Sequence, residues 1–188
     1  PCILTTPILL NSILLMKITE IRPYAVRAGI RNLLIVKIES DDGHFGWGES
    51  GVVGRELAVL GAINHFRNFL LGKDPRRVGA LWQEMYRGQY FEGGRILSGA
   101  ISAIDIALHD MIARSLDIPV YQLLGGKQRD SVPCFTTSRV PMGPEAVGDA
   151  KRLVDLGWPV IRFGWGNHYT GKDELLFEPR ESLPETAK

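Results

Sequence analysis

Residues 116–126 read Leu-Asp-Ile-Pro-Val-Tyr-Gln-Leu-Leu-Gly-Gly, and the sequence has a different pattern on each side of this stretch. Before it, strand patterns come first and helical patterns follow, which is typical of an α+β domain. After it, from Ser131, an apolar run, a helical pattern and a second apolar run follow in that order. This order indicates two parallel strands joined by a crossover helix. The stretch therefore marks the boundary between an α+β region and a region with parallel strands.

The region before the boundary begins with an antiparallel meander. Residues 16–26 form an extended run. Residues 33–39 have a period of two, with Leu34, Val36 and Ile38 on one face and Ile35, Lys37 and Glu39 on the other, and residues 44–49 return after an Asp-Asp-Gly turn. Helices are then predicted over residues 56–71, from Asp74-Pro75 onward, and over residues 96–116. The expected apolar stripe of the first helix includes Leu57, Leu60, Phe66 and Leu70.

The region after the boundary contains too few elements for a stable sheet. Strands are predicted over residues 132–136 and 160–163, with a helix over residues 145–156 between them. A parallel sheet needs more neighbours and cover on both faces. Residues 131–188 are therefore expected to be an incomplete domain, whose last helix begins near Pro179 and is cut at Lys188.

The first fifteen residues do not fit this fold. They are apolar but interrupted by Pro and Asn, too short for a membrane span of about 20 residues, and not arranged as a signal peptide. The chain begins with Pro, and Met16 opens the first strand pattern. We expect residues 1–15 to be an unstructured or extraneous leader.

The composition excludes several classes of function. The chain has 188 residues, 45% of them hydrophobic, with 22 Lys and Arg against 21 Asp and Glu. This balance provides no electrostatic field for binding nucleic acid or an anionic membrane. Only Cys2 and Cys134 are present, far apart, which argues against a disulfide framework or a thiolate zinc site. A cytoplasmic location is expected.

Five motifs in order carry a resemblance to a known family. They are Met-Lys-Ile-Thr at 16–19, Gly-Trp-Gly-Glu at 46–49, Leu-Gly-Lys-Asp-Pro at 71–75, Ser-Ala-Ile-Asp-Ile-Ala-Leu-His-Asp at 102–110 and Pro-Val-Tyr-Gln-Leu-Leu-Gly-Gly at 119–126. With this spacing, residues 16–188 resemble the N-terminal part of the mandelate racemase and muconate lactonizing enzyme family of the enolase superfamily. Residues 82–87 and Gly93-Gly94 are most similar to galactonate-dehydratase-like sugar-acid dehydratases.

The resemblance implies a fold and a chemistry. Residues 16–130 would be an α+β capping domain, and residues 131–188 the first strands of a truncated (β/α) TIM-type barrel. The reaction would remove the proton next to a carboxylate of a small sugar acid, with Mg²⁺ stabilising the enediolate. The family's metal carboxylates follow later barrel strands, so no metal ligand is assigned in this chain. Relatives commonly form symmetric assemblies, so a homo-oligomer is expected for the full-length protein.

Two barrel residues are candidates for the site. Arg162 stands where many relatives have a Lys-x-Lys base motif, and Gly164 replaces its second Lys. An arginine can hold a carboxylate or the enediolate, but its pKa is too high for a general base. This disfavours a racemase or cycloisomerase, the alternative within the family, although Arg162 could also be only a structural ion-pair residue. His168, in a loop after the strand, could contact substrate or deliver a proton, or be incidental.

Two glycine-containing loops of the cap are expected to overhang the barrel mouth as a lid. They are residues 26–31 and 50–55, and the candidate substrate-binding residues are Arg27, Arg31, Val53 and Arg55. A closing lid would exclude water from the reaction. The arginines could pair with the carboxylate of an acid sugar, or they could be solvated charges on turns.

Other features are interpreted as structural. Asp105 and His109 lie four residues apart on one helix and are expected to pair internally or to contact the barrel. Gly125-Gly126 lacks the rest of a nucleotide-binding motif and is interpreted as a helix cap. A second class of function also stays open, in which the chain is an inactive fragment that acts only as a folded cap or as an association module through exposed apolar surface.

Overall fold

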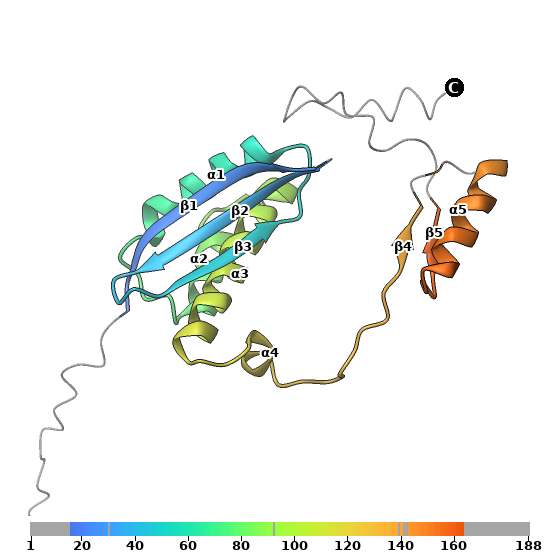
Figure 1. Ribbon diagram of the computed structural model, residues 1–188. Coiled ribbons are helices and arrows are strands. Elements are labelled where there is room, and N and C mark those ends of the chain that lie inside the picture. Colours follow the sequence, from blue (N-terminus) through green and yellow to red (C-terminus); the bar gives the residue numbers. More distant parts are fainter. Residues whose placement is uncertain (1–15, 30, 92, 139, 141–142, 164–188) are drawn as a thin grey trace, which may run out of the picture.

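The computed structural model describes residues 16–29, 31–91, 93–138, 140 and 143–163 (Figure 1). The predicted leader 1–15, His168 and the predicted helix near Pro179 lie outside the described residues. The described elements form an N-terminal unit, β1–β3 with α1–α4, and a C-terminal unit, β4, α5 and β5. These two names are kept below.

A three-stranded antiparallel sheet opens the N-terminal unit, as the alternation predicts. Its strands are β1 (Ile18–Ala28), β2 (Arg31–Ser40) and β3 (Phe45–Ser50), in that order across the sheet. Gly43, at φ 88°, supplies the left-handed residue of the β2–β3 turn. Along β2 the alternate residues Leu34, Val36 and Ile38 are fully buried, so one face of the sheet is the core face.

Three helices cover the core face of this sheet (Figure 1). They are α1 (Glu56–Leu70), α2 (Val78–Arg87) and α3 (Gly94–Ser115), and a short α4 (Val120–Leu123) follows. Leu70, Leu81 and Leu108 are among the buried residues that join helices to sheet. Because each fully buried aliphatic side chain stabilises by about 1.5–3 kcal/mol, this layer holds the unit together.

Helix α3 lies against β3 at very short range. A Cβ on Gly48 would lie 1.9 Å from the carbonyl oxygen of Ala103, and one on Gly46 would lie 2.0 Å from that of Ala107. Only glycine permits this approach. α3 is long and apolar enough to cross a membrane by length and composition. Its buried residues pack in the core, however, which is the ordinary environment of a central helix.

Two details of the predicted helices were wrong. Leu57 is 56% exposed, whereas Val59, two residues later, is fully buried. The face of the helix that packs on the core therefore includes Val59 and not Leu57. The second helix begins at Val78 and not at Asp74-Pro75. The Asp74 carboxylate accepts hydrogen bonds from the backbone N–H of Arg76 at 3.0 Å and from its guanidinium, and this local turn competes with helix formation.

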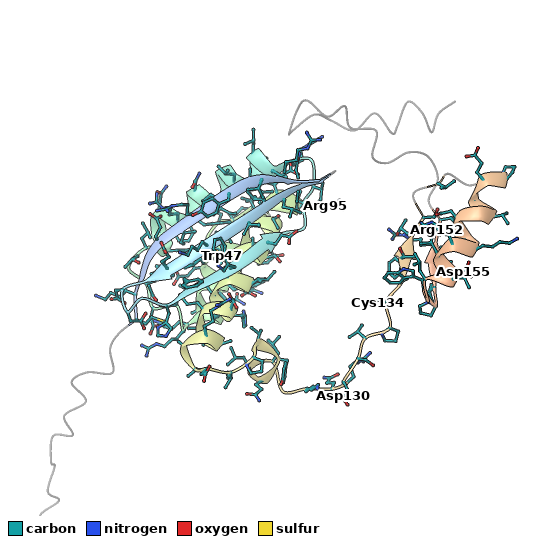
Figure 2. All side chains as sticks on the ribbon, viewed as in Figure 1. Trp47, Arg95, Asp130, Cys134, Arg152 and Asp155 are labelled. Carbon is teal, nitrogen blue, oxygen red and sulfur yellow. The ribbon has the colours of Figure 1, made fainter. Side chains whose placement is uncertain are left out.

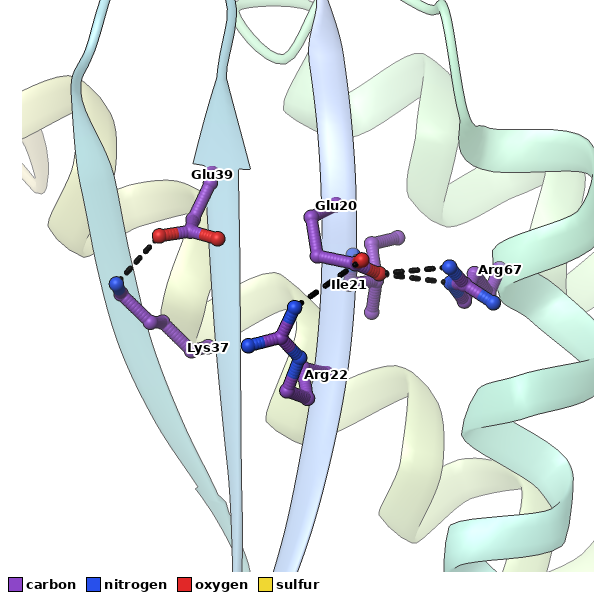
Figure 3. A network of polar contacts seen from close by, with 6 residues as sticks. All are labelled: Glu20, Ile21, Arg22, Lys37, Glu39 and Arg67. Atoms are coloured by element: carbon purple, nitrogen blue, oxygen red, sulfur yellow. Dashed lines mark hydrogen bonds and ion pairs between the residues drawn. The ribbon is translucent and has the colours of Figure 1, made fainter.

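A network of charged side chains ties β1 to α1 (Figure 3). The Glu20 carboxylate accepts hydrogen bonds from the Ile21 N–H at 3.0 Å and the Arg67 Nε at 2.9 Å, and the Arg22 Nη2 lies 3.4 Å from its other oxygen. Burial raises the pKa of the Glu20 carboxyl, but the N–H of Ile21 and the two guanidinium groups lower it more, so it lies below its ordinary value. On β2, Lys37 Nζ pairs with Glu39 at 2.5 Å.

The C-terminal unit has the predicted order of strand, helix and parallel strand. It comprises β4 (Thr136–Thr137), α5 (Pro144–Asp155) and β5 (Ile161–Arg162), and β4 pairs with β5 in parallel. The predicted strand over residues 132–136 is too long, because Val132 is 67% exposed and residues 131–135 form no ladder. A strand without neighbours on both sides cannot bury such side chains.

Candidate functional site

The two predicted lid loops emerge at the same end of the sheet. The pairing register places Ala25, Leu34 and Ser50 in line across the three strands. The β1–β2 turn and loop 51–55 both continue beyond this line. Figure 2 shows Arg95, in the first turn of α3, at this end of the unit as well. This end of the unit, where the two predicted lid loops lie, therefore gathers segments from three parts of the sequence.

The β1–β2 turn carries the first two candidate residues. Gly29 has φ 61°, a left-handed conformation that suits the tight turn. The exposed Arg27 side chain donates a hydrogen bond from Nε to the Gly29 carbonyl oxygen at 3.1 Å. The backbone of Arg31 pairs with Ala28 across the turn. Both arginines thus sit at the tip of the hairpin.

Loop 51–55 carries the other two. Val53 is 42% exposed, and the exposed Arg55 donates from Nη1 to the Gly54 carbonyl oxygen at 2.5 Å. The base of the loop packs on α3, where a Cβ on Gly99 would lie 2.5 Å from Val52 Cγ2. Gly54 has φ 78°, so the loop turns sharply just before α1. An exposed valine and a guanidinium at its tip can contact a small anionic molecule.

Glu56 is a residue of this loop region that the sequence reasoning missed. It is 1% exposed at the first position of α1, and its Oε1 accepts a hydrogen bond from the Gly54 N–H at 2.6 Å. Its Oε2 is buried and has no hydrogen-bond donor among the described residues. An acidic residue at a helix start is a visible signal in sequence, but it normally indicates a solvated charge.

Arg162 lies at the end of β5, in the C-terminal unit. Its side chain is exposed, its Nε donates to Thr137 Oγ1 at 3.1 Å, and its guanidinium lies 5.1 Å from the Phe135 ring centre. The hydroxyl and the ring orient the guanidinium while it keeps its charge. His168 lies outside the described residues, so the structure brings no second candidate next to Arg162.

The predicted pairing of Asp105 and His109 is confirmed. His109 Nδ1 lies 3.4 Å from Asp105 Oδ2 and 2.9 Å from the Asp105 carbonyl oxygen. Both residues line a surface pocket of about 500 Å³. The other lining residues are Trp47, Ile106, Asp110, Arg114, Val120 and Leu124.

The described residues do not fit a magnesium site. Across residues 16–29, 31–91, 93–138, 140 and 143–163, no three His, Cys, Asp or Glu side chains come together. Mg²⁺ needs several oxygen ligands, commonly with at least one carboxylate.

Comparison with known proteins identifies relatives along most of the chain. Residues 14–125 match the model of the mandelate racemase / muconate lactonizing enzyme N-terminal domain. A D-galactonate dehydratase of Variovorax paradoxus is 41% identical over 142 residues, which are 76% of this chain and 36% of the relative. A D-mannonate dehydratase of Novosphingobium aromaticivorans is 37% identical over 177 residues, which are 90% of this chain and 44% of the relative.

Solved structures show the same likeness. An enolase from Pantoea ananatis, solved with bound D-gluconate and Mg, is 33% identical with a TM-score of 0.74, and the match covers 80% of this chain and 37% of that one. The chain thus spans less than half the length of each of these relatives. With a family model that matches more than half of its residues, the chain belongs to the mandelate racemase and muconate lactonizing enzyme family.

Proposed function

We propose that this chain is the N-terminal part of a Mg²⁺-dependent acid-sugar dehydratase. In this proposal residues 16–130 are the capping domain, residues 131–188 begin the barrel, and residues 1–15 lie outside the fold. Support comes from the relatives, which are named D-galactonate and D-mannonate dehydratases, and from the relative solved with D-gluconate and Mg. The protein would act in the cytoplasm on a small sugar acid, as a homo-oligomer.

The observation that carries the proposal is the placement of the two lid loops. Arg27 and Arg31 on the hairpin tip and Arg55 on loop 51–55 stand at one end of the sheet. An anionic substrate at this end would meet the guanidinium groups of Arg27 and Arg55, each suited to bind a carboxylate. Arg31 is a third candidate by its position in the sequence. Val53, which is exposed in loop 51–55, would contact the carbon chain of the substrate.

The reaction would be a β-elimination of water. A proton leaves the carbon next to the carboxylate, hydroxide leaves the adjacent carbon, and the resulting enol becomes a 2-keto-3-deoxy acid. Arg162 would hold the substrate carboxylate or the enediolate by charge, because a guanidinium does not lose its proton at neutral pH. We assign the proton donor role to His168 on its position after β5 alone. The magnesium ligands would come from outside the described residues.

The proposal is tested on the whole protein encoded by the reading frame that contains this chain. D-Galactonate, D-mannonate and D-gluconate are incubated with it and Mg²⁺, and formation of a 2-keto-3-deoxy acid is measured. We expect turnover of at least one of them. Exchange of the proton next to the carboxylate with solvent deuterium, without loss of water, would instead indicate the racemase or cycloisomerase alternative.

A substitution in loop 51–55 tests whether this loop binds the substrate. Arg55→Ala is expected to raise KM by about tenfold, because a hydrogen bond to a charged group contributes about 1.5–3 kcal/mol. Arg76→Ala is the matched control, because Arg76 is also an exposed arginine but lies near the opposite end of the sheet. There the Ile18 N–H donates to the carbonyl oxygen of Lys73, three residues before Arg76. Equal KM values for both variants would remove Arg55 from the substrate site.

A second candidate function is an association module without activity. The observation that favours it is the exposed apolar surface of the C-terminal unit, where Phe135, Leu156 and Val160 are each more than half exposed. Light scattering of the 188-residue chain tests it. Concentration-dependent association that is lost in Leu156→Asp would support the module, and a monomer would contradict it.

A further inference from the structure

The carboxylate of Glu56 lies in an environment where acidic side chains are rare. Its side chain is 1% exposed, although its position at the start of α1 would allow it to face solvent. Acidic residues are almost never fully buried unless they are paired. Burial of one acceptor without a donor is unfavourable, and Glu56 Oε2 has none among the described residues. Packing alone does not explain this residue, since an apolar side chain would fill the same space at lower cost.

Among the described residues, this carboxylate accepts one hydrogen bond, which holds the tip of loop 51–55. Glu56 Oε1 accepts from the Gly54 N–H at 2.6 Å, and Arg55 Nη1 donates to the Gly54 carbonyl oxygen at 2.5 Å. Both peptide groups of Gly54 are thus fixed by the two residues that follow it. Glycine at φ 78° is free to adopt other conformations, so these bonds select one of them.

A second anchor lies at the base of the same loop. Val52 packs over Gly99 of α3, and the Val52 N–H donates to Ser50 Oγ at 3.3 Å. The loop is therefore fixed before Val53 by packing and after it by Glu56. Loss of the Glu56 contact would free Val53 and Arg55 while the base of the loop stayed in place.

We infer that Glu56 is a positioning residue, which holds Gly54 so that Arg55 and Val53 present a preformed surface to the substrate. The inference rests on the proposed function, because it needs loop 51–55 to bind the sugar acid. Glu56 acts through the loop and does not contact the substrate. Its role is to reduce the ordering that the loop must undergo when substrate binds.

The test compares Glu56→Ala and Glu56→Gln in the whole protein. Alanine removes the acceptor for the Gly54 N–H, whereas glutamine keeps a carbonyl oxygen of the same reach. We expect Glu56→Ala to raise KM about tenfold with kcat within about twofold, and Glu56→Gln to stay within about twofold of wild type in both. Leu57→Ala, which truncates an exposed side chain in the same helical turn, is the matched control and should be unchanged.

Hydrogen exchange at the Gly54 amide gives an independent readout. We expect it to be at least tenfold faster in Glu56→Ala than in wild type and unchanged in Glu56→Gln. An unchanged KM in Glu56→Ala, or a Glu56→Gln variant as impaired as Glu56→Ala, would overturn the inference while leaving the dehydratase proposal intact. A wild-type protein that turns over no sugar acid would overturn both.

Discussion

The two units of the chain differ in how far their apolar side chains are buried. In the N-terminal unit Val36, Ile104 and Leu108 are completely buried between sheet and helices. In the C-terminal unit Val147, Val154 and Val160 are each more than half exposed, and Ala146 and Leu153 are its buried hydrophobic residues among those described. Three strands and three helices enclose a core, whereas two short parallel strands and one helix do not. The two predicted lid loops thus belong to the unit that has a buried core of its own.

Truncation of a buried side chain should show the largest difference between the two units in its effect on the free energy of unfolding. Leu108→Ala is expected to lower the free energy of unfolding by about 3–5 kcal/mol, since the side chain is fully buried in α3 and its loss leaves a cavity. Leu153→Ala, in α5, should change the same transition by less than about 0.5 kcal/mol. Urea denaturation monitored by circular dichroism measures both. Equal effects would mean that the two units unfold as one.

The close contact of α3 with β3 is the next most sensitive point. Gly48→Ala is expected to cost about 2–3 kcal/mol, because its Cβ would meet the Ala103 carbonyl oxygen at 1.9 Å and backbone cannot move aside locally. Gly61→Ala is the control: this residue is exposed in α1 with no heavy atom within 4 Å of an added Cβ, so stability should rise by about 0.5–1 kcal/mol. The same urea titration compares them, and a tolerated Gly48→Ala would show that the helix does not lie this close.

Glu20 should give a smaller, pH-dependent effect confined to the N-terminal unit. Its folded-state pKa is lowered, so the carboxylate stabilises the fold above its unfolded pKa of about 4.3. This contribution is lost as the pH falls through the folded pKa. Glu20→Gln should therefore be less stable than wild type by about 0.5–1 kcal/mol at pH 7 and equal to it in acid. A stability difference between wild type and Glu20→Gln that does not change with pH would exclude the charged contacts of Glu20 as its cause.

The smallest effect is expected at Asp149 in the C-terminal unit. Ser138 Oγ donates to its carboxylate at 2.5 Å and Arg152 Nη2 lies 2.7 Å away, and these contacts lower the pKa of Asp149. In Ser138→Ala the pKa should rise toward the ordinary value of about 3.9. Carboxyl NMR titration measures the change. The unfolding midpoint of the N-terminal unit should not move, and a shift of that midpoint would link the units energetically.

The faces of the sheet were predictable from the sequence, and the contacts of the site were not. Alternation along β2 identifies Leu34, Val36 and Ile38 as core residues, because a strand has only two faces. The burial of Glu56 and its bond to the Gly54 N–H have no such repeating pattern in the sequence. The contact of Val52 with Gly99 joins residues that are distant in sequence. Pro75 indicated a helix start, but the local turn made by Asp74 was not visible in the motif.

Hydrogen exchange of the 188-residue chain tests the central claim most directly, namely that a unit with a core of its own is joined to a unit without one. The account predicts that amides of β2 and α3, such as those of Val36 and Leu108, exchange only through global unfolding. The amides of Thr136, Ser138 and Leu156, which are bonded within the C-terminal unit, should exchange with little protection. Equal protection in both units would contradict the account.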